Sequence, residues 1–205
     1  MYALIEGGVI AKTFNNPRRL VVNNIRYSTK IYSLWSKEEK ESIGLYEVVY
    51  DNSNKRDEDW YINTNETLSF ADGVVTASYG SATARLLEDR NEVDEDDNPL
   101  LDSDGNQVVT KGLKTIKKEM IDRQCAGLLQ DSDWRVIKAK ETGTTMDAGW
   151  KSWRASVRTK CNSMQDQIDG ASDVDALATL FAYTNTGTEE NPVMERPLGE
   201  FPIKE

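Results

Sequence analysis

The strongest constraint on the chemistry of this chain is that it lacks histidine. The chain has 205 residues and no histidine, so it cannot build a Ser-His-Asp or Cys-His nucleophilic site, and it lacks the commonest transition-metal ligand. Glycoside hydrolysis by a pair of carboxylates stays open, as does a lysine-based site. No set of residues amounts to a convincing active site, so we expect a protein that is not an enzyme and that holds no cofactor.

The densest group of potential metal ligands is the acidic run over residues 92–97, followed by Asp102–Asn106. Alternating Asp and Asn resemble an EF-hand calcium loop, which needs Gly at its sixth position and a bidentate Glu at its twelfth. Other residues occupy these two positions in both possible registers: Pro99 and Gly105, or Gln107 and Leu113. The spacing therefore predicts a solvated connector with a β-turn rather than a metal site.

A candidate binding site of another kind is an aromatic pair that precedes amide side chains. Trp60 and Tyr61 precede Asn63, Thr64 and Asn65, and exposed aromatic rings next to amides can stack on a sugar and hydrogen-bond it. A host-surface glycan is thus a conceivable ligand. The alternative, which we favour, is a strand with one inward aromatic residue followed by a polar turn.

Composition narrows the class of protein further. The formal charge of −10 argues against nucleic-acid binding, which needs a basic face, and no run approaches the roughly 20 apolar residues of a membrane span. The N-terminus lacks the pattern of a secretory signal, so we expect synthesis in a cytoplasm. Cys125 and Cys161 are too few for a disulfide framework and are interpreted as small buried thiols in a reducing compartment.

Residues 1–88 are expected to form a β-rich, mostly antiparallel domain. Gly7-Gly8 and Asp72-Gly73 have the composition of hairpin turns between short strands. Ser36 and Glu39 have capping-box spacing and should begin a short helix that ends at Gly44. Residues 89–112 follow as the acidic connector.

Residues 113–183 are expected to be helical. A first helix carries the apolar residues Leu113, Ile116, Met120 and Leu128, with lysines on its other side. The clearest periodic signal is a stripe spaced 4, 3, 4, 4, 3, 4 on a later helix: Met146, Trp150, Trp153, Val157, Cys161, Met164 and Ile168. The stripe can pack against the first helix within one chain, which bulky Trp favours, or it can form a seam between chains of a homo-oligomer.

The fold class predicted from these patterns is α+β. The antiparallel β-rich domain comes first and a helical hairpin follows it. Residues 184–205, with three of the five prolines, are expected to be an extended tail.

The helical part resembles a module of bacteriophage tail-fibre and tail-assembly proteins. That module has a helix ending in Arg-x-x-x-Leu-Leu, a Ser/Thr-Asp-Trp step, and a helix with Trp-x-x-Tyr-Arg-x-x-Leu-Arg. The matching residues here are Arg123, Leu128-Leu129, Ser132-Asp133-Trp134, Trp150, Trp153, Arg154, Val157 and Arg158. The gap after Arg123 is longer than in the pattern, Trp153 stands where Tyr is usual, and Val157 stands where Leu is usual.

The resemblance implies a non-enzymatic structural protein of the virion tail (a fibre, adaptor or baseplate element) that binds other tail proteins. It brings no catalytic residue with it. Trp134, Arg154 and Arg158 are the candidate docking residues, because Trp and Arg dominate interface energetics. The alternatives are a tail-fibre assembly chaperone absent from the finished particle and, less favoured, a tail-associated glycan hydrolase.

Overall fold

The computed structural model describes residues 1–204, and the chain divides into two units, Met1–Thr83 and Ala84–Glu205. The mixture of β structure first and helices second agrees with the predicted α+β class. The boundary lies five residues before the predicted one, and the expected connector and tail both belong to the helical unit. The elements of the first unit are β1 (Tyr2–Glu6), β2 (Val9–Phe14), β3 (Leu20–Val22), β4 (Ile25–Tyr27), α1 (Ile31–Leu34), α2 (Lys37–Ser42), β5 (Leu45–Asp51), β6 (Tyr61–Ile62), β7 (Thr67–Ala71) and β8 (Val74–Ser78), and β9 (Thr83–Ala84) straddles the boundary.

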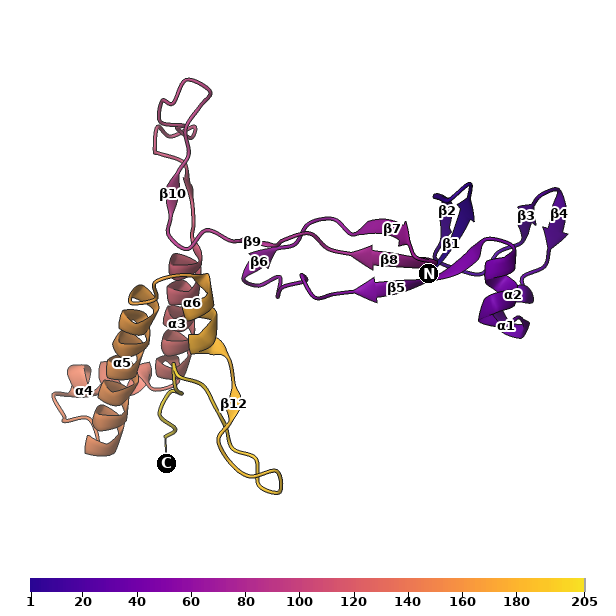
Figure 1. Ribbon diagram of the computed structural model, residues 1–205. Coiled ribbons are helices and arrows are strands. Elements are labelled where there is room, and N and C mark those ends of the chain that lie inside the picture. Colours follow the sequence, from indigo (N-terminus) through magenta and orange to yellow (C-terminus); the bar gives the residue numbers. More distant parts are fainter. Residues whose placement is uncertain (205) are drawn as a thin grey trace. The chain divides into compact units, whose positions relative to one another are not determined.

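The first unit is organised by a five-stranded sheet of order β2-β1-β5-β8-β7 (Figure 1). Its pairs are antiparallel except β5 with β8, which are parallel. The hairpin turns form where the sequence predicts them, since Gly7, Gly8, Asp72 and Gly73 all have positive φ. The short hairpin of β3 and β4 turns at Asn23-Asn24, also at positive φ, and was not predicted.

Side chains alternate between the two faces of this sheet and form two small cores. One face buries Leu4 and Leu45 against Phe14, Ile31 and Tyr32. The other face buries Ala3, Val48, Val75 and Ala77. Helices α1 and α2 lie between β4 and β5 in the chain, and Ile31 and Tyr32 of α1 belong to the first core.

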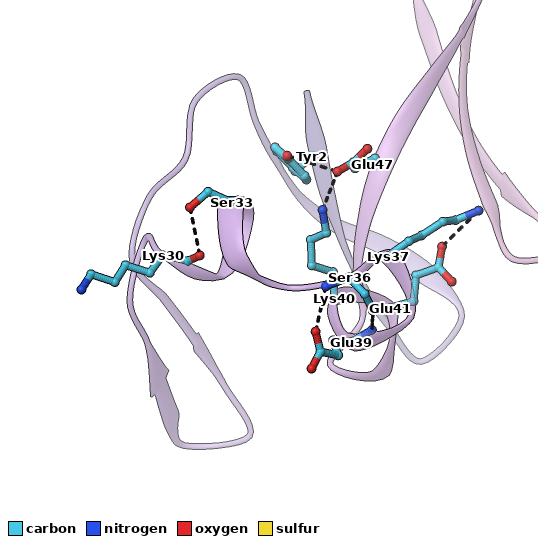
Figure 2. A network of polar contacts seen from close by, with 9 residues as sticks. All are labelled: Tyr2, Lys30, Ser33, Ser36, Lys37, Glu39, Lys40, Glu41 and Glu47. Carbon is cyan, nitrogen blue, oxygen red and sulfur yellow. Dashed lines mark hydrogen bonds and ion pairs between the residues drawn. The ribbon is translucent and has the colours of Figure 1, made fainter.

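The start of α2 is held by the capping box that the sequence predicts, drawn in Figure 2. Glu39 N donates to the Ser36 hydroxyl at 3.2 Å, and Ser36 N donates to the Glu39 carboxylate at 2.7 Å. Lys40 of the same helix is buried and donates to Glu47 of β5 at 2.6 Å. This hydrogen bond lowers the pKa of Glu47 and raises that of Lys40, so the pair fastens α2 to the sheet.

The second unit has a different architecture, with two antiparallel helices at its centre. Helices α3 and α5 lie side by side (Figure 1), and α6, which follows α5 in the chain, contacts α5. Gly143 ends α4 in the left-handed conformation, while Asp147 and Asp173 cap α5 and α6 through their carboxylates. The elements are β10 (Arg90–Asn91), β11 (Val109–Thr110), α3 (Leu113–Gln130), α4 (Asp133–Thr142), α5 (Ala148–Asp169), α6 (Val174–Phe181), β12 (Thr184–Asn185) and β13 (Met194–Glu195).

The buried face of α3 agrees with the predicted one only in part, since Leu113 is buried and Met120 is half-buried. Ile116 and Leu128 are exposed, while Ile121 and Cys125 are buried. Lys114, expected on the solvent side, is also buried, and its ammonium donates to Glu88 at 2.6 Å and to the Asp169 carbonyl at 2.9 Å. The C-terminal end of α5 carries partial negative charge, so it draws a lysine toward it. The apolar pattern of α3 alone therefore identifies only part of the buried face.

Residues 89–112 form an ordered arm that contains the predicted turn at Asp102–Asn106 and a second turn like it. The eight residues Val93–Leu100 repeat as Leu101–Val108: each repeat begins a tight turn with Asp and closes it with Asn four residues later. Asp94 Oδ1 accepts hydrogen bonds from Asp96 N and Asn98 N at 2.9 Å, and Asp102 Oδ1 accepts the same two bonds from Asp104 N and Asn106 N at 2.9 Å. These bonds from backbone N–H groups lower the pKa of both aspartates.

The two turns and the β10–β11 ladder meet at a three-way junction. Glu92 N donates to Val108 O, Leu100 N to Glu92 O, and Val108 N to Leu100 O, at 2.8–2.9 Å, so three residues spaced by eight close a ring. The side-chain amide of Gln107 donates to the same three carbonyls at 2.7–3.2 Å. Pro99 occupies the corresponding position in the first repeat and cannot serve in this way. The arm therefore has a fixed shape without an apolar core.

The C-terminal segment folds back onto the helices, contrary to the prediction of an extended tail. β12 and β13 pair as a hairpin, and Leu198 is fully buried. Leu198 O accepts from the Lys160 ammonium at 2.8 Å, and Pro202 O accepts from the indole N–H of Trp153 at 3.0 Å. The segment thus covers part of α5.

Candidate docking surface

Arg154 connects the three parts of the motif that the sequence sets apart. It lies on α5 and is 5% exposed. Its guanidinium donates to the Leu129 carbonyl at 2.7 Å, to the Ser132 hydroxyl, and to the Asp133 carboxylate at 2.6 Å. Ser132 is also buried, and its hydroxyl donates to Leu129 O at 2.8 Å. One planar group therefore binds the end of α3 and the start of α4.

This geometry corrects the role expected of Arg154. A docking residue must be accessible to a partner, and Arg154 is enclosed by its own unit. Ser132 does not cap α4 through its side chain, because its hydroxyl is used toward Leu129. Ser132, Asp133 and Arg154 instead form a buried clamp that sets the direction in which α4 leaves α3.

Helix α4 is the most accessible part of the unit. None of its ten residues, all of them described, is buried. Trp134 is 51% exposed and Ile137 56% exposed, and Val136 is exposed as well. The Arg135 guanidinium lies 4.6 Å from the Trp134 ring centroid and the Lys138 ammonium 5.8 Å from it. Large apolar side chains on an exposed helix are a mark of an interaction surface.

Trp150 and Trp153, at the start of α5, occupy an intermediate position. Both are half-buried, and their rings meet edge to face with centroids 5.6 Å apart. Arg135 of α4 lies 4.5 Å from the centre of the Trp150 ring, so this guanidinium is placed between Trp134 and Trp150. The aromatic and cationic side chains of α4 and α5 therefore form one continuous surface.

A groove runs along this surface between α4 and the start of α5. Its larger hollow is about 470 Å³ and its smaller one about 160 Å³, and Ala139, Thr144, Thr145 and Met146 line both. Apolar and cationic side chains both line the groove. The charged residues that line it are Arg135, Lys138, Lys151, Arg158 and Asp147, together with the buried Arg154 of the clamp.

The net charge of this region has the opposite sign to that of the whole chain. Residues 133–158 contain six basic and three acidic residues, a net charge of +3 in a chain of −10. Two of the three carboxylates are engaged: Asp133 with Arg154, and Asp147 with the backbone N–H of Trp150 at 3.0 Å. We call the exposed face of α4 together with this groove, over residues 134–158, the docking surface.

The predicted stripe divides into two parts. Val157, Cys161, Met164 and Ile168 are buried on α5, which packs chiefly against α3, so this half is an internal core. Trp150, Trp153 and Met146 are half-buried near the docking surface, and Met146 precedes α5 rather than lying on it. Arg158 is exposed on the rim of the groove. The residues missed by sequence reasoning are Arg135, Lys138 and Lys151, whose signal was the local excess of positive charge.

Two other candidates have positions that do not suit a site. Trp60 and Tyr61 are each 8% exposed, so neither ring offers the stacking face that a glycan needs. Cys125 and Cys161 are buried free thiols, and burial raises the pKa of Cys161 to about 12, which keeps it protonated. Over residues 1–204, no group of three or more His, Cys, Asp or Glu side chains is arranged to hold a metal ion.

Comparison with protein-family models, with curated proteins and with solved structures finds no match to this chain. Among the described helices, none is long and apolar enough to cross a membrane.

Proposed function

We propose that this chain is a non-enzymatic structural protein of a bacteriophage tail, which joins the assembly through the docking surface of its helical unit. The observation that carries the proposal is α4, a helix with exposed Trp134, Val136 and Ile137 and no buried residue. An isolated helix of ten residues is marginal in water, so its persistence depends on the Arg154 clamp. Such a helix is held in place to present a face.

The bacteriophage setting rests on the resemblance of residues 123–158 to the tail module. The clamp gives a physical reason for the residue pattern that carries this resemblance. Leu129, Ser132 and Asp133 supply the acceptors, and Arg154, twenty-one residues after Asp133, supplies the donors. A module whose motif fixes an exposed helix is suited to binding other tail proteins.

The test is mass spectrometry of purified particles of the bacteriophage that encodes this chain. We expect the chain in intact particles, in constant ratio to the other tail proteins. Its absence from particles, together with loss of tails when its gene is deleted, would instead identify an assembly chaperone. Hydrolysis of capsular polysaccharide by the purified chain, abolished by one carboxylate substitution, would contradict the non-enzymatic role.

A further inference from the structure

We infer that the docking surface binds the acidic arm of a second copy of this chain, so that copies associate head to tail. This inference rests on the proposed function and names one partner for the same surface. It depends on the match between two parts of the unit, the basic groove beside α4 and the arm over residues 91–108.

The groove offers positive charge beside apolar side chains. Arg135, Lys138, Lys151 and Arg158 line it, together with Val136 and Met146. The ligand that fits is therefore acidic and has aliphatic side chains next to its carboxylates. A nucleic acid would satisfy the cations, but the remainder of the chain, at a net charge of −13, repels it.

The arm has the opposite charge and the same mixed character. Residues 91–108 contain seven acidic residues and no basic one. The carboxylates of Asp94 and Asp102 are used within the turns, whereas Glu95, Asp96 and Asp104 are exposed. Leu101 is 55% exposed and Leu100 42% exposed. The three-way junction holds these groups in a defined arrangement before binding, which reduces the entropy lost on association.

The two surfaces lie at opposite ends of α3, so one chain cannot easily join its own. The arm enters α3 at its N-terminus, where Leu113 N donates to Leu86 O at 2.8 Å, and α4 follows the C-terminus of α3. An 18-residue helix is about 27 Å long, so the two surfaces are separated by roughly that distance. Arm-to-groove binding between copies is heterologous and leaves one free surface at each end, which gives rings or filaments.

The experiment is sedimentation velocity on the full chain and on three triple variants. The arm variant carries Glu95→Lys, Asp96→Lys and Asp104→Lys. The groove variant carries Arg135→Glu, Lys138→Glu and Lys151→Glu. The control variant makes the same charge change as the groove variant on exposed positions of the first unit: Lys12→Glu, Arg19→Glu and Arg26→Glu. Circular dichroism establishes that each variant keeps its helices.

We expect the wild-type chain and the control variant to associate as concentration rises, and the association constant to fall at least tenfold between about 0.05 M and 0.5 M NaCl. The arm and groove variants should each stay monomeric alone, because the net charge of the arm falls from −7 to −1 in the first and the groove becomes acidic like the arm in the second. They should associate when mixed, through the unchanged groove of the arm variant and the unchanged arm of the groove variant. A wild-type chain that is monomeric up to on the order of 1 mM would overturn the inference, as would a folded groove variant that associates like the wild type. Detection of the chain in particles despite such a monomeric result would retain the proposed function and assign the groove to another tail protein.

Discussion

Removing the Arg154 guanidinium is the most informative single change for the structure of the helical unit. Arg154→Ala removes the charged donor from the Leu129 carbonyl, which keeps the bonds from the backbone N–H and the hydroxyl of Ser132, and it leaves the buried Ser132 hydroxyl oxygen without a donor. A hydrogen bond to a charged group contributes about 1.5–3 kcal/mol, and an unsatisfied buried group costs about 1–3 kcal/mol. The ion pair with Asp133 adds little, since that carboxylate is 55% exposed. We therefore expect the free energy of unfolding to fall by about 2–4 kcal/mol.

The measurement is urea unfolding of the full chain followed by circular dichroism at the helical minimum, because every helix of eight or more residues in the described chain belongs to the second unit. Arg154→Lys keeps the charge but loses the planar fork, in which one nitrogen binds Leu129 and Ser132 and the other binds Asp133, so it should lose about half as much stability. Arg158→Ala is the matched control: it removes the same group from an exposed position on the same helix and should change stability by less than about 0.5 kcal/mol. Equal stability of Arg154→Ala and Arg158→Ala would refute the clamp.

Three further predictions test other parts of the structure. Gln107→Ala should speed hydrogen exchange of the amides of Glu92, Leu100 and Val108, because their carbonyl partners lose a common donor, whereas Gln130→Ala should not. Because the pKa of Glu47 is lowered, its pairing with Lys40 stabilises the first unit above about pH 4.5, and this stabilisation is lost as the pH falls. Because the pKa of Lys40 is raised, the same stabilisation is also lost as the pH rises above about 10.5. Glu47→Gln should therefore flatten both ends of the pH profile of the free energy of unfolding. The Cys161 thiol, with its pKa raised from 9.0 to about 12, should react slowly with a disulfide reagent until the chain unfolds. The free energy of unfolding should decline from about pH 9 toward pH 12, and Cys161→Ala should remove this decline.

Local interactions explain the features that could be predicted from sequence. The capping box at Ser36 and the turn at Asp72-Gly73 depend on residues within four positions of one another, so the sequence contains the whole interaction. The same holds for the stripe on α5, whose half from Val157 to Ile168 is buried as its period indicates.

The features that escaped prediction depend on partners distant in sequence. The buried face of α3 depends on Lys114 meeting the end of α5, fifty-five residues later. The three-way junction joins residues spaced by eight, although the repeat of Asp-x-Asp-x-Asn was visible in the sequence. Arg154 was singled out for its type, but its burial follows from acceptors more than twenty residues away, which no local pattern reveals.

The central claim, that α4 presents a docking surface for tail assembly, is tested most directly by the amount of Trp134→Ala in purified particles. Trp134 is 51% exposed, so its removal should leave the unfolding curve of the chain within about 0.5 kcal/mol of wild type. Loss of an interface Trp commonly weakens binding by about 2 kcal/mol or more, so we predict an at least tenfold lower content of the Trp134→Ala chain per particle. The control is Ile62→Ala, which changes an exposed apolar residue of the first unit and should assemble normally. Wild-type content of Trp134→Ala in particles would contradict the account.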